Sequence, residues 1–244
     1  MKLAIVQLEP VKGDIEKNIT QHVSWIKKAA QQGADMVVFP ELSLSGYEPE
    51  LASSIATNQD DKRLDVIQAL SNEYQVTVGA GLPTRDGDNL FISMIIFRPS
   101  QARITYSKQF LYPTETSVFT AANNPLALPF GAETVAPAIC YELSNKEHHE
   151  MAAQNKATAY VASVLNAVSG VDADLEKLGD IAKQYQMTTM MANFIGTSGG
   201  YACAGKSSVW NKDGQLLAQL GTEEEGMIVF DTETKEANIV AENR

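Results

Sequence analysis

The sequence has few of the features that mark several classes of protein. Among 244 residues there are 2 cysteines, Cys140 and Cys203, too few for a disulfide framework. The 19 basic residues are outnumbered by 30 acidic ones, and the net charge of −11 disfavours nucleic acid and anionic membrane surfaces as partners. No apolar run reaches the length of a membrane span, and the apolar stretch at the N-terminus is too short for a signal peptide. We therefore expect a cytoplasmic protein.

What the sequence does contain is the balance of a globular chain, with 44% hydrophobic and 20% charged residues. No repeat, low-complexity tract or Gly/Ser linker divides it, so we predict a single domain over residues 1–244. The last residues, 233–244, are polar, and we expect either a loose tail or an arm that packs on a neighbour.

Strand and helix patterns alternate along the chain. Asp14 and Gly33 are suitable ends for a first helix, whose inward face would carry Ile15, Ile19, Val23, Ile26 and Ala30, with His22 on the polar side. Further helices are predicted at 61–74, 145–155 and 172–185. Strands are predicted at 3–8, 36–39, 76–82, 90–98, 102–107, 134–139, 159–165, 188–192, 207–210, 215–220 and 227–231. This mixture predicts an α/β protein made of layered sheets flanked by helices.

Three reactive side chains directly follow predicted strands. Glu41 is placed to act as a general base, since partial burial would raise its pKa towards neutrality. Lys108 would hold a fixed positive charge where an oxyanion develops. Cys140 would supply a thiolate nucleophile before a helix. Taken singly, each also fits a plainer interpretation: a surface glutamate, a solvated lysine and a small buried thiol.

The order of these residues, with their surroundings, resembles the nitrilase superfamily, the carbon–nitrogen hydrolases. The resemblance covers nearly the whole chain. It rests on the blocks AIVQLEP, GAD before VVFPE, the Lys108 segment with Glu115, ICYE around Cys140, ANFIG, and GKSSV before Asp213 and Gly214. It implies a four-layer α-β-β-α sandwich whose subunits pair into a homodimer or a higher homo-oligomer.

The resemblance also implies a mechanism, in which Glu41 accepts the proton of Cys140 and the thiolate attacks an amide carbonyl or a nitrile carbon. Lys108 and the backbone N–H of Tyr141 would stabilise the oxyanion, and Glu115 would be the second glutamate that orients the lysine and the substrate. A thioester intermediate and release of ammonia or an amine follow. The implied substrate is a small-molecule amide, and neither a metal nor an organic cofactor is needed.

By the same resemblance, we expect Tyr47, Tyr112, Glu142, Leu165 and Asn166 to lie at the substrate pocket. The sequence departs from the family near two of these positions. The arginine usual after the nucleophile is absent, and so is an aromatic residue before Asn166. The substrate therefore cannot be transferred from other members. Short aliphatic amides, ω-amides and N-carbamoyl compounds stay open.

Rival interpretations involve other polar residues. His148 and His149 follow Cys140, but we expect them to face water on a polar helix, without the partners of a Cys-His hydrolase or the spacing of a zinc site. Residues 200–207 match the phosphate-binding pattern G-x-x-x-x-G-K-S, yet a strand and not a helix is predicted after them. Cys203 is interpreted as a loop thiol near the pocket mouth. A catalytically idle scaffold protein of the same fold is the remaining alternative.

Overall fold

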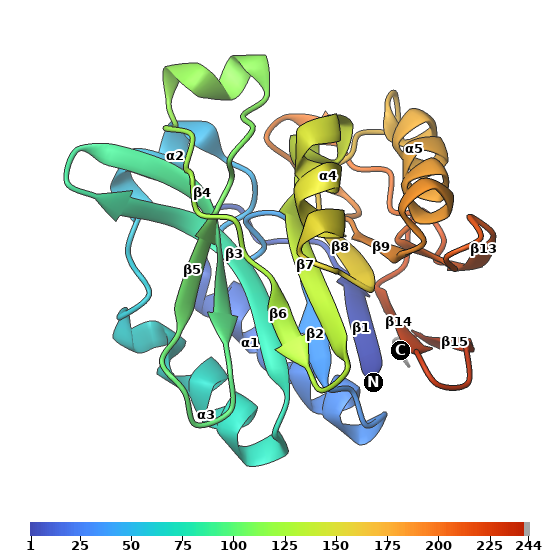
Figure 1. Cartoon of the computed structure of the whole chain (residues 1–244). Helices are drawn as coiled ribbons and strands as arrows, with labels where there is room; N and C mark the ends of the chain where they lie inside the picture. Colours follow the sequence, from blue (N-terminus) through green and yellow to red (C-terminus); the bar gives the residue numbers. More distant parts are fainter. Residues whose placement is uncertain (242–244) are drawn as a thin grey trace.

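A computed structural model describes residues 1–241 and contains two sheets whose inner faces pack together (Figure 1). The seven-stranded sheet has the order β15-β14-β1-β2-β3-β4-β5. Its strands are β1 (Lys2–Gln7), β2 (Met36–Val38), β3 (Thr77–Asp86), β4 (Asn89–Phe97), β5 (Ile104–Ser107), β14 (Gly226–Asp231) and β15 (Ala237–Ala241).

The six-stranded sheet has the order β13-β12-β9-β8-β7-β6. Its strands are β6 (Leu128–Phe130), β7 (Glu133–Ile139), β8 (Ala159–Ser163), β9 (Thr188–Ala192), β12 (Ser208–Trp210) and β13 (Leu216–Gln219). A separate two-stranded ribbon pairs β10 (Thr197–Ser198) with β11 (Tyr201–Ala202).

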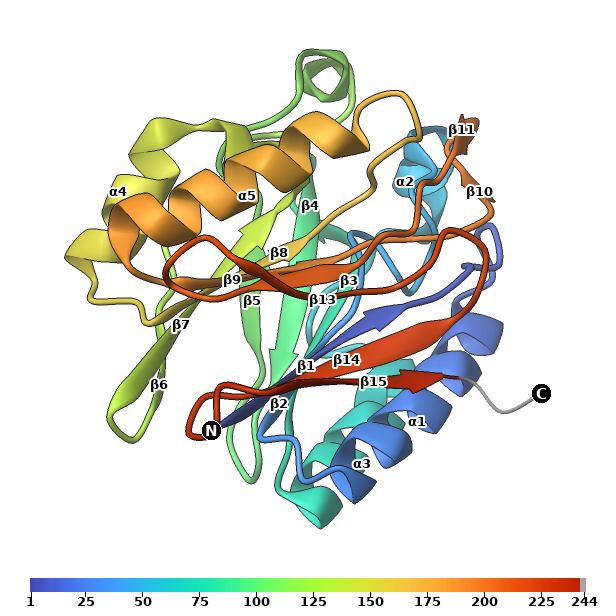
Figure 2. The same ribbon diagram turned by 90° about the vertical axis from the view of Figure 1, so that its right-hand side faces the viewer.

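Helices cover the outer face of each sheet, as Figure 2 shows most clearly. On the seven-stranded sheet lie α1 (Ile15–Gln31) and α3 (Asp65–Tyr74), and on the six-stranded sheet lie α4 (Lys146–Gln154) and α5 (Val171–Tyr185). The remaining helical segments are α2 (Pro49–Ile55) and the 3₁₀ turns η1 (Lys62–Leu64), η2 (Pro113–Ser117) and η3 (Cys140–Ser144). The predicted four-layer α-β-β-α sandwich is confirmed.

Three hydrophobic cores hold the four layers together. In β1, Ala4 and Val6 face the core under α1, whereas Leu3 and Ile5 face the core between the sheets. This alternation follows from the two-residue period of a strand, and both faces are apolar because both are buried. The third core lies between the six-stranded sheet and its two helices and contains Leu178 of α5.

The first helix begins and ends where the sequence predicts. The Asp14 side chain accepts a hydrogen bond from the Lys17 N–H, and Gly33 follows the helix with a left-handed φ of +75°. The predicted inward face, however, is displaced around the helix. Its buried residues are Ile15, Asn18, Ile19, His22, Trp25, Ile26 and Ala29. His22 is therefore buried, and the expectation that it lies at the surface is wrong.

Two other predictions need correction. Residues 237–241 are not a loose tail, because they form β15, which pairs antiparallel with β14 at the edge of the seven-stranded sheet. Residues 242–244 lie outside the described part of the chain. His148 and His149 do not face water, because α4 begins at Lys146 and its first turn packs on the six-stranded sheet. Within residues 1–241, no helix is long and apolar enough to cross a membrane.

Candidate active site

The three predicted reactive residues follow strands of both sheets and meet at one end of the sandwich. Glu41 comes after β2 and Lys108 after β5, in the seven-stranded sheet, whereas Cys140 follows β7 in the six-stranded sheet. The two sheets are joined at this end by a 2.7 Å hydrogen bond from Ser163 Oγ to the Phe39 carbonyl. The site is therefore built across the sheet–sheet interface.

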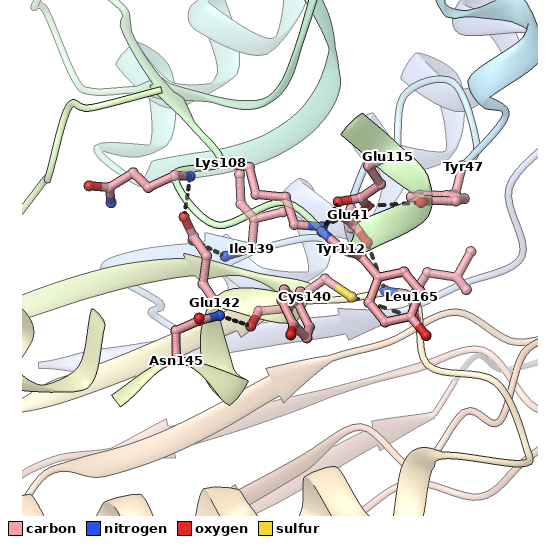
Figure 3. A network of polar contacts seen from close by, with 12 residues as sticks. Glu41, Tyr47, Lys108, Tyr112, Glu115, Ile139, Cys140, Glu142, Asn145 and Leu165 are labelled. Carbon is pink, nitrogen blue, oxygen red and sulfur yellow. Dashed lines mark hydrogen bonds and ion pairs between the residues drawn. The ribbon is translucent and has the colours of Figure 1, made fainter. Parts of the chain in front are cut away.

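Lys108 lies between two carboxylates, and all three side chains are buried (Figure 3). Its Nζ is 2.7 Å from Glu41 Oε1 and 2.8 Å from Glu115 Oε1. Glu115 is oriented in turn by the Tyr47 hydroxyl at 2.8 Å and by the Tyr112 N–H at 2.6 Å. The ammonium group consequently has a fixed position, with its charge balanced by two anions.

Cys140 sits where β7 turns into η3, with a left-handed φ of +45°. Such a backbone conformation is strained for a residue other than glycine, and it occurs often at functional sites. The thiol donates to the Leu165 carbonyl, with Sγ 3.6 Å from the oxygen. The Leu165 N–H in turn donates to Glu41 Oε2 at 3.3 Å. The segment after β8 thus touches both the nucleophile candidate and the base candidate.

Burial controls the ionisation of this cluster. It raises the pKa of Glu41, against the opposing effect of Lys108. It also raises the pKa of the Cys140 thiol well above its usual value, and the Glu41 charge adds to this rise. Burial alone would lower the pKa of Lys108, but the charge of Glu41 and its neighbours outweighs it and raises that pKa. At rest we therefore expect a thiol, a glutamate of raised pKa and a permanent ammonium group.

A cavity of about 390 Å³ opens onto this cluster. Its walls include Glu41, Tyr47, Tyr112, Glu115, Cys140, Tyr141, Ser144, Leu165, Asn166, Asp174, Lys177 and Tyr201. A larger open groove of about 780 Å³, beside Asn58 and Arg85, has none of the clustered titratable residues in its walls. We place the candidate site in the smaller cavity because that is where the reactive groups converge.

Four of the five predicted pocket residues line this cavity: Tyr47, Tyr112, Leu165 and Asn166. The prediction for Glu142 is wrong, because its carboxylate points away from the cavity and is fully buried. In a 3₁₀ turn, which has about three residues per turn, residues two apart face different directions. Glu142 instead accepts hydrogen bonds from the backbone N–H groups of Ile139 and Gln109, both at 2.6 Å.

The cavity also contains residues that sequence reasoning missed. Lys177 of α5 extends over the nucleophile turn, where its Nζ lies 2.8 Å from Ser144 Oγ and 2.9 Å from Asp174 Oδ1. Tyr201 enters from the two-stranded ribbon. These residues carry no local sequence signal, since only the packing of α5 and the ribbon against the turn brings them here.

The rival candidates take other places. Cys203 is buried in the core under α1 and does not line the cavity, and burial raises the pKa of its thiol to about 11. The phosphate-binding pattern at 200–207 is followed by β12, as predicted, so no helix N-terminus faces it. Its Lys206 pairs with Asp172 at 2.7 Å. In the part of the chain that the structure describes, no group of three or more His, Cys, Asp or Glu side chains is arranged to hold a metal ion.

The arrangement has the parts needed for nucleophilic attack on a polarised carbon. Cys140 supplies the nucleophile, Glu41 accepts a proton, and Lys108 supplies a positive charge that is already in place when negative charge develops. Because the charge of Lys108 is held by two carboxylates before any substrate arrives, little reorganisation is required during the reaction.

Comparison with known proteins leads to the same fold. The sequence model of the carbon–nitrogen hydrolase family matches residues 2–238. The chain is 29% identical to a protein called "Hydrolase in agr operon" from Staphylococcus aureus, over 100% of this chain and 95% of that relative. It is 25% identical to an (R)-stereoselective amidase from Pseudomonas sp, over 92% and 82% of the two chains. The solved structure of a mutant amidase from Nesterenkonia sp. AN1, in complex with butyramide, matches with a TM-score of 0.86 at 24% identity, over 96% of this chain and 92% of that chain.

Proposed function

The chain belongs to the carbon–nitrogen hydrolase family and is a hydrolase of carbon–nitrogen bonds other than peptide bonds; from this premise we propose that it is a thiol amidase. The proposed catalytic residues are Glu41, Lys108 and Cys140. One observation carries this proposal: the two carboxylates that hold the fully buried Lys108, those of Glu41 and Glu115, line the same cavity as the Cys140 thiol. A buried charge destabilises the fold unless it is paired, and the two carboxylates supply that pairing here.

In the proposed reaction, Glu41 takes the proton of the Cys140 thiol while Sγ bonds to the amide carbon. The carbonyl oxygen becomes an oxyanion, which Lys108 and the Tyr141 N–H stabilise. A well-placed donor of this kind contributes about 3 kcal/mol to the lowering of the barrier. The carbon–nitrogen bond then breaks, and the nitrogen leaves with the proton from Glu41. Water, deprotonated by Glu41, hydrolyses the thioester and restores the thiol.

Glu115 acts in this scheme as a positioning residue. It shares Lys108 with Glu41 and is itself oriented by the Tyr47 hydroxyl. Burial raises the pKa of Tyr47, and the neighbouring carboxylates raise it further, so the hydroxyl stays protonated and donates to Glu115. Glu115 Oε1 thus accepts hydrogen bonds from both the Tyr47 hydroxyl and the Lys108 ammonium group.

The size of the cavity restricts the proposed substrate to a small amide and does not select one class of amide. A volume of about 390 Å³ suits a compact molecule, and its walls mix tyrosines with polar side chains such as Asn166 and Lys177. Short aliphatic amides, ω-amides and N-carbamoyl compounds all fit this description. By family resemblance we also propose a homodimer, and the need to keep a catalytic thiol reduced favours the cytoplasm.

Ammonia release from a panel of these three amide classes tests the proposed function, together with the intact mass of the protein during turnover. We expect wild-type enzyme and the Cys203→Ser variant to release ammonia and to carry an acyl adduct, whereas Cys140→Ser does neither. Ammonia release that survives in Cys140→Ser, or an adduct that maps to Cys203, would contradict the thiol mechanism. A wild-type chain inactive on the whole panel would favour the idle scaffold instead.

A further inference from the structure

A chain of buried hydrogen bonds runs from outside the cavity to the turn that carries Cys140. Its members come from β8, α4, β5 and η3: Tyr160, His148, Tyr106 and Glu142. The Tyr160 hydroxyl is 2.8 Å from His148 Nδ1, His148 Nε2 is 2.9 Å from the Tyr106 hydroxyl, and that hydroxyl is 2.7 Å from Glu142 Oε2. All four side chains are at most 5% exposed, and none lines the cavity.

The donors and acceptors of this chain can have one consistent direction. When Glu142 is ionised its carboxylate only accepts, so Tyr106 donates to it. The Tyr106 oxygen is then available to accept from His148 Nε2–H, which leaves Nδ1 to accept from the Tyr160 hydroxyl. This requires a neutral His148, and burial lowers the pKa of His148 to about 4. The network is fully satisfied in this state.

At its other end, the Glu142 carboxylate holds two backbone segments of the active site (Figure 3). Oε2 accepts the N–H of Ile139, the residue before Cys140, and Oε1 accepts the N–H of Gln109, the residue after Lys108. Both distances are 2.6 Å. A single carboxylate therefore joins the strand end that carries the nucleophile to the strand end that carries the buried lysine.

This joint matters because the nucleophile turn is strained. Cys140 has a φ of +45°, and such a conformation persists only where its surroundings hold it. Small displacements of reacting groups lower rates strongly, since attack needs a narrow range of distance and direction. A loosened joint would let Cys140 relax away from Lys108 without changing either side chain.

We propose that Glu142 is a positioning residue that fixes the spacing of Cys140 and Lys108, and that Tyr106, His148 and Tyr160 hold its carboxylate in place. This inference rests on the proposed function, in which those two residues act together. A purely structural role is the competing explanation, since any buried carboxylate needs hydrogen-bond donors. The two explanations differ in whether the network affects reactivity in the folded protein.

Three tyrosine-to-phenylalanine variants separate these explanations, because each removes a single oxygen. Tyr106→Phe removes the hydroxyl that touches Glu142, and Tyr160→Phe removes the one that touches His148. Tyr185→Phe is the matched control: its ring contacts His149 of α4, and its hydroxyl is buried but has no hydrogen-bond partner among the described residues. Burial raises the pKa of Glu142 to about 7, and the Tyr106 hydroxyl opposes this rise. The variants are therefore compared at a pH well above 7, where Glu142 stays ionised and the electrostatics at the thiol change little.

Two experiments are carried out well below the melting temperature. The first measures the rate at which iodoacetamide alkylates Cys140, with the site confirmed by peptide mass mapping. The second measures kcat and KM for an amide that the panel identifies. We expect Tyr106→Phe to lower both kcat and the alkylation rate roughly tenfold, the value for loss of one hydrogen bond to a charged group, with little change in KM. Tyr160→Phe should have a smaller effect in the same direction, and Tyr185→Phe should match the wild type.

The proposal is overturned if Tyr106→Phe melts at a lower temperature but keeps wild-type rates, if its loss lies in KM alone, or if Tyr185→Phe slows equally. Should Tyr106→Phe not fold, Tyr160→Phe decides by the same comparison. The alkylation rates need no substrate. Failure of the wild type to hydrolyse any amide would therefore refute the proposed function, while the comparison of variants still decides the role of Glu142.

Discussion

Lys108 Nζ lies 2.7 Å from Glu41 Oε1, and neither side chain is exposed to solvent. A buried pair of this kind is strongly destabilised when one partner is removed, because the other charge stays buried without compensation. We expect Lys108→Met to lower the free energy of unfolding by about 3–5 kcal/mol, since it strands both Glu41 and Glu115, and to abolish amide hydrolysis. Urea unfolding measures the first effect and ammonia release the second.

The control for this prediction is Lys206→Met. Lys206 forms an ion pair of the same 2.7 Å length with Asp172, whose side chain is 80% exposed. Exposed pairs contribute about 0–1 kcal/mol, so this variant should unfold almost as the wild type does. Equal losses of stability in the two lysine variants would show that burial is not the deciding factor.

The pH dependence of catalysis follows from the direction of two pKa shifts. Burial raises the pKa of Glu41, which must be ionised to accept the thiol proton, so activity should fall as pH decreases through a value above the usual 4.3 or so for glutamate. The raised pKa of Lys108 keeps its charge beyond the usual 10.4 or so, so deprotonation of this lysine should not limit activity below that pH. A kcat/KM profile measures both limbs, and an acid limb at the ordinary glutamate value would contradict the first assignment.

His22 should make the stability of the fold depend on pH. Its Nδ1 lies 2.7 Å from the Asn18 carbonyl, its Nε2 lies 2.8 Å from Ser43 Oγ, and burial lowers its pKa to about 3. In the unfolded chain a histidine has its ordinary pKa of about 6.5. Between this pH and the lower pKa of the folded state, His22 of the unfolded chain binds a proton that His22 of the folded chain does not. The free energy of unfolding should therefore fall with decreasing pH by about 1.4 kcal/mol per unit from this residue.

His22→Gln removes this contribution, whatever its effect on absolute stability. Urea unfolding at several pH values between about 6 and 4.5 should show a shallower slope for the variant than for the wild type, by about 1.4 kcal/mol per pH unit. Identical slopes would mean that His22 is protonated in the folded protein or reaches solvent.

Gly81 in β3 lies against the turn that carries Glu41. A Cβ at this position would come 2.4 Å from the Leu42 backbone nitrogen, which cannot move without moving Glu41. We expect Gly81→Ala to cost about 1–3 kcal/mol of stability and to reduce kcat, since overpacking shifts the backbone. Gly221→Ala is the control, because its Cβ would meet nothing within 4 Å. Normal kcat in Gly81→Ala would show that the turn adapts without moving the carboxylate.

The sequence predicts the main residues of the site because they obey a simple rule. Glu41, Lys108 and Cys140 each come directly after an apolar strand, and side chains at strand ends converge at the edge of packed sheets. The strand and helix pattern also predicts layered sheets flanked by helices, whereas the four-layer sandwich and the cavity residues Leu165 and Asn166 are implied by the resemblance to the carbon–nitrogen hydrolases. The strand pattern marks each position locally, but the order of the three residues along the chain and the blocks around them are what predict a shared site.

The histidines show where such reasoning fails. His148 was predicted at the surface because its neighbours are polar, yet it bonds to Tyr106 and Tyr160, which are far away in sequence. Nothing local indicates these partners. His22 is different, since it lies three residues after Ile19 and four before Ile26, in the middle of the buried stripe. A predicted inward face with His22 in place of its neighbour Val23 would have matched the buried face of the helix more closely.

The position of the site between the two sheets couples catalysis to cooperative unfolding. The seven-stranded sheet carries Glu41 and Lys108, the six-stranded sheet carries Cys140 and Leu165, and a hydrophobic core is what holds the two sheets together. A partly denatured chain that keeps both sheets but lets them separate would retain its secondary structure and lose the site entirely. Activity should consequently disappear together with the inter-sheet core in denaturant, and never survive it.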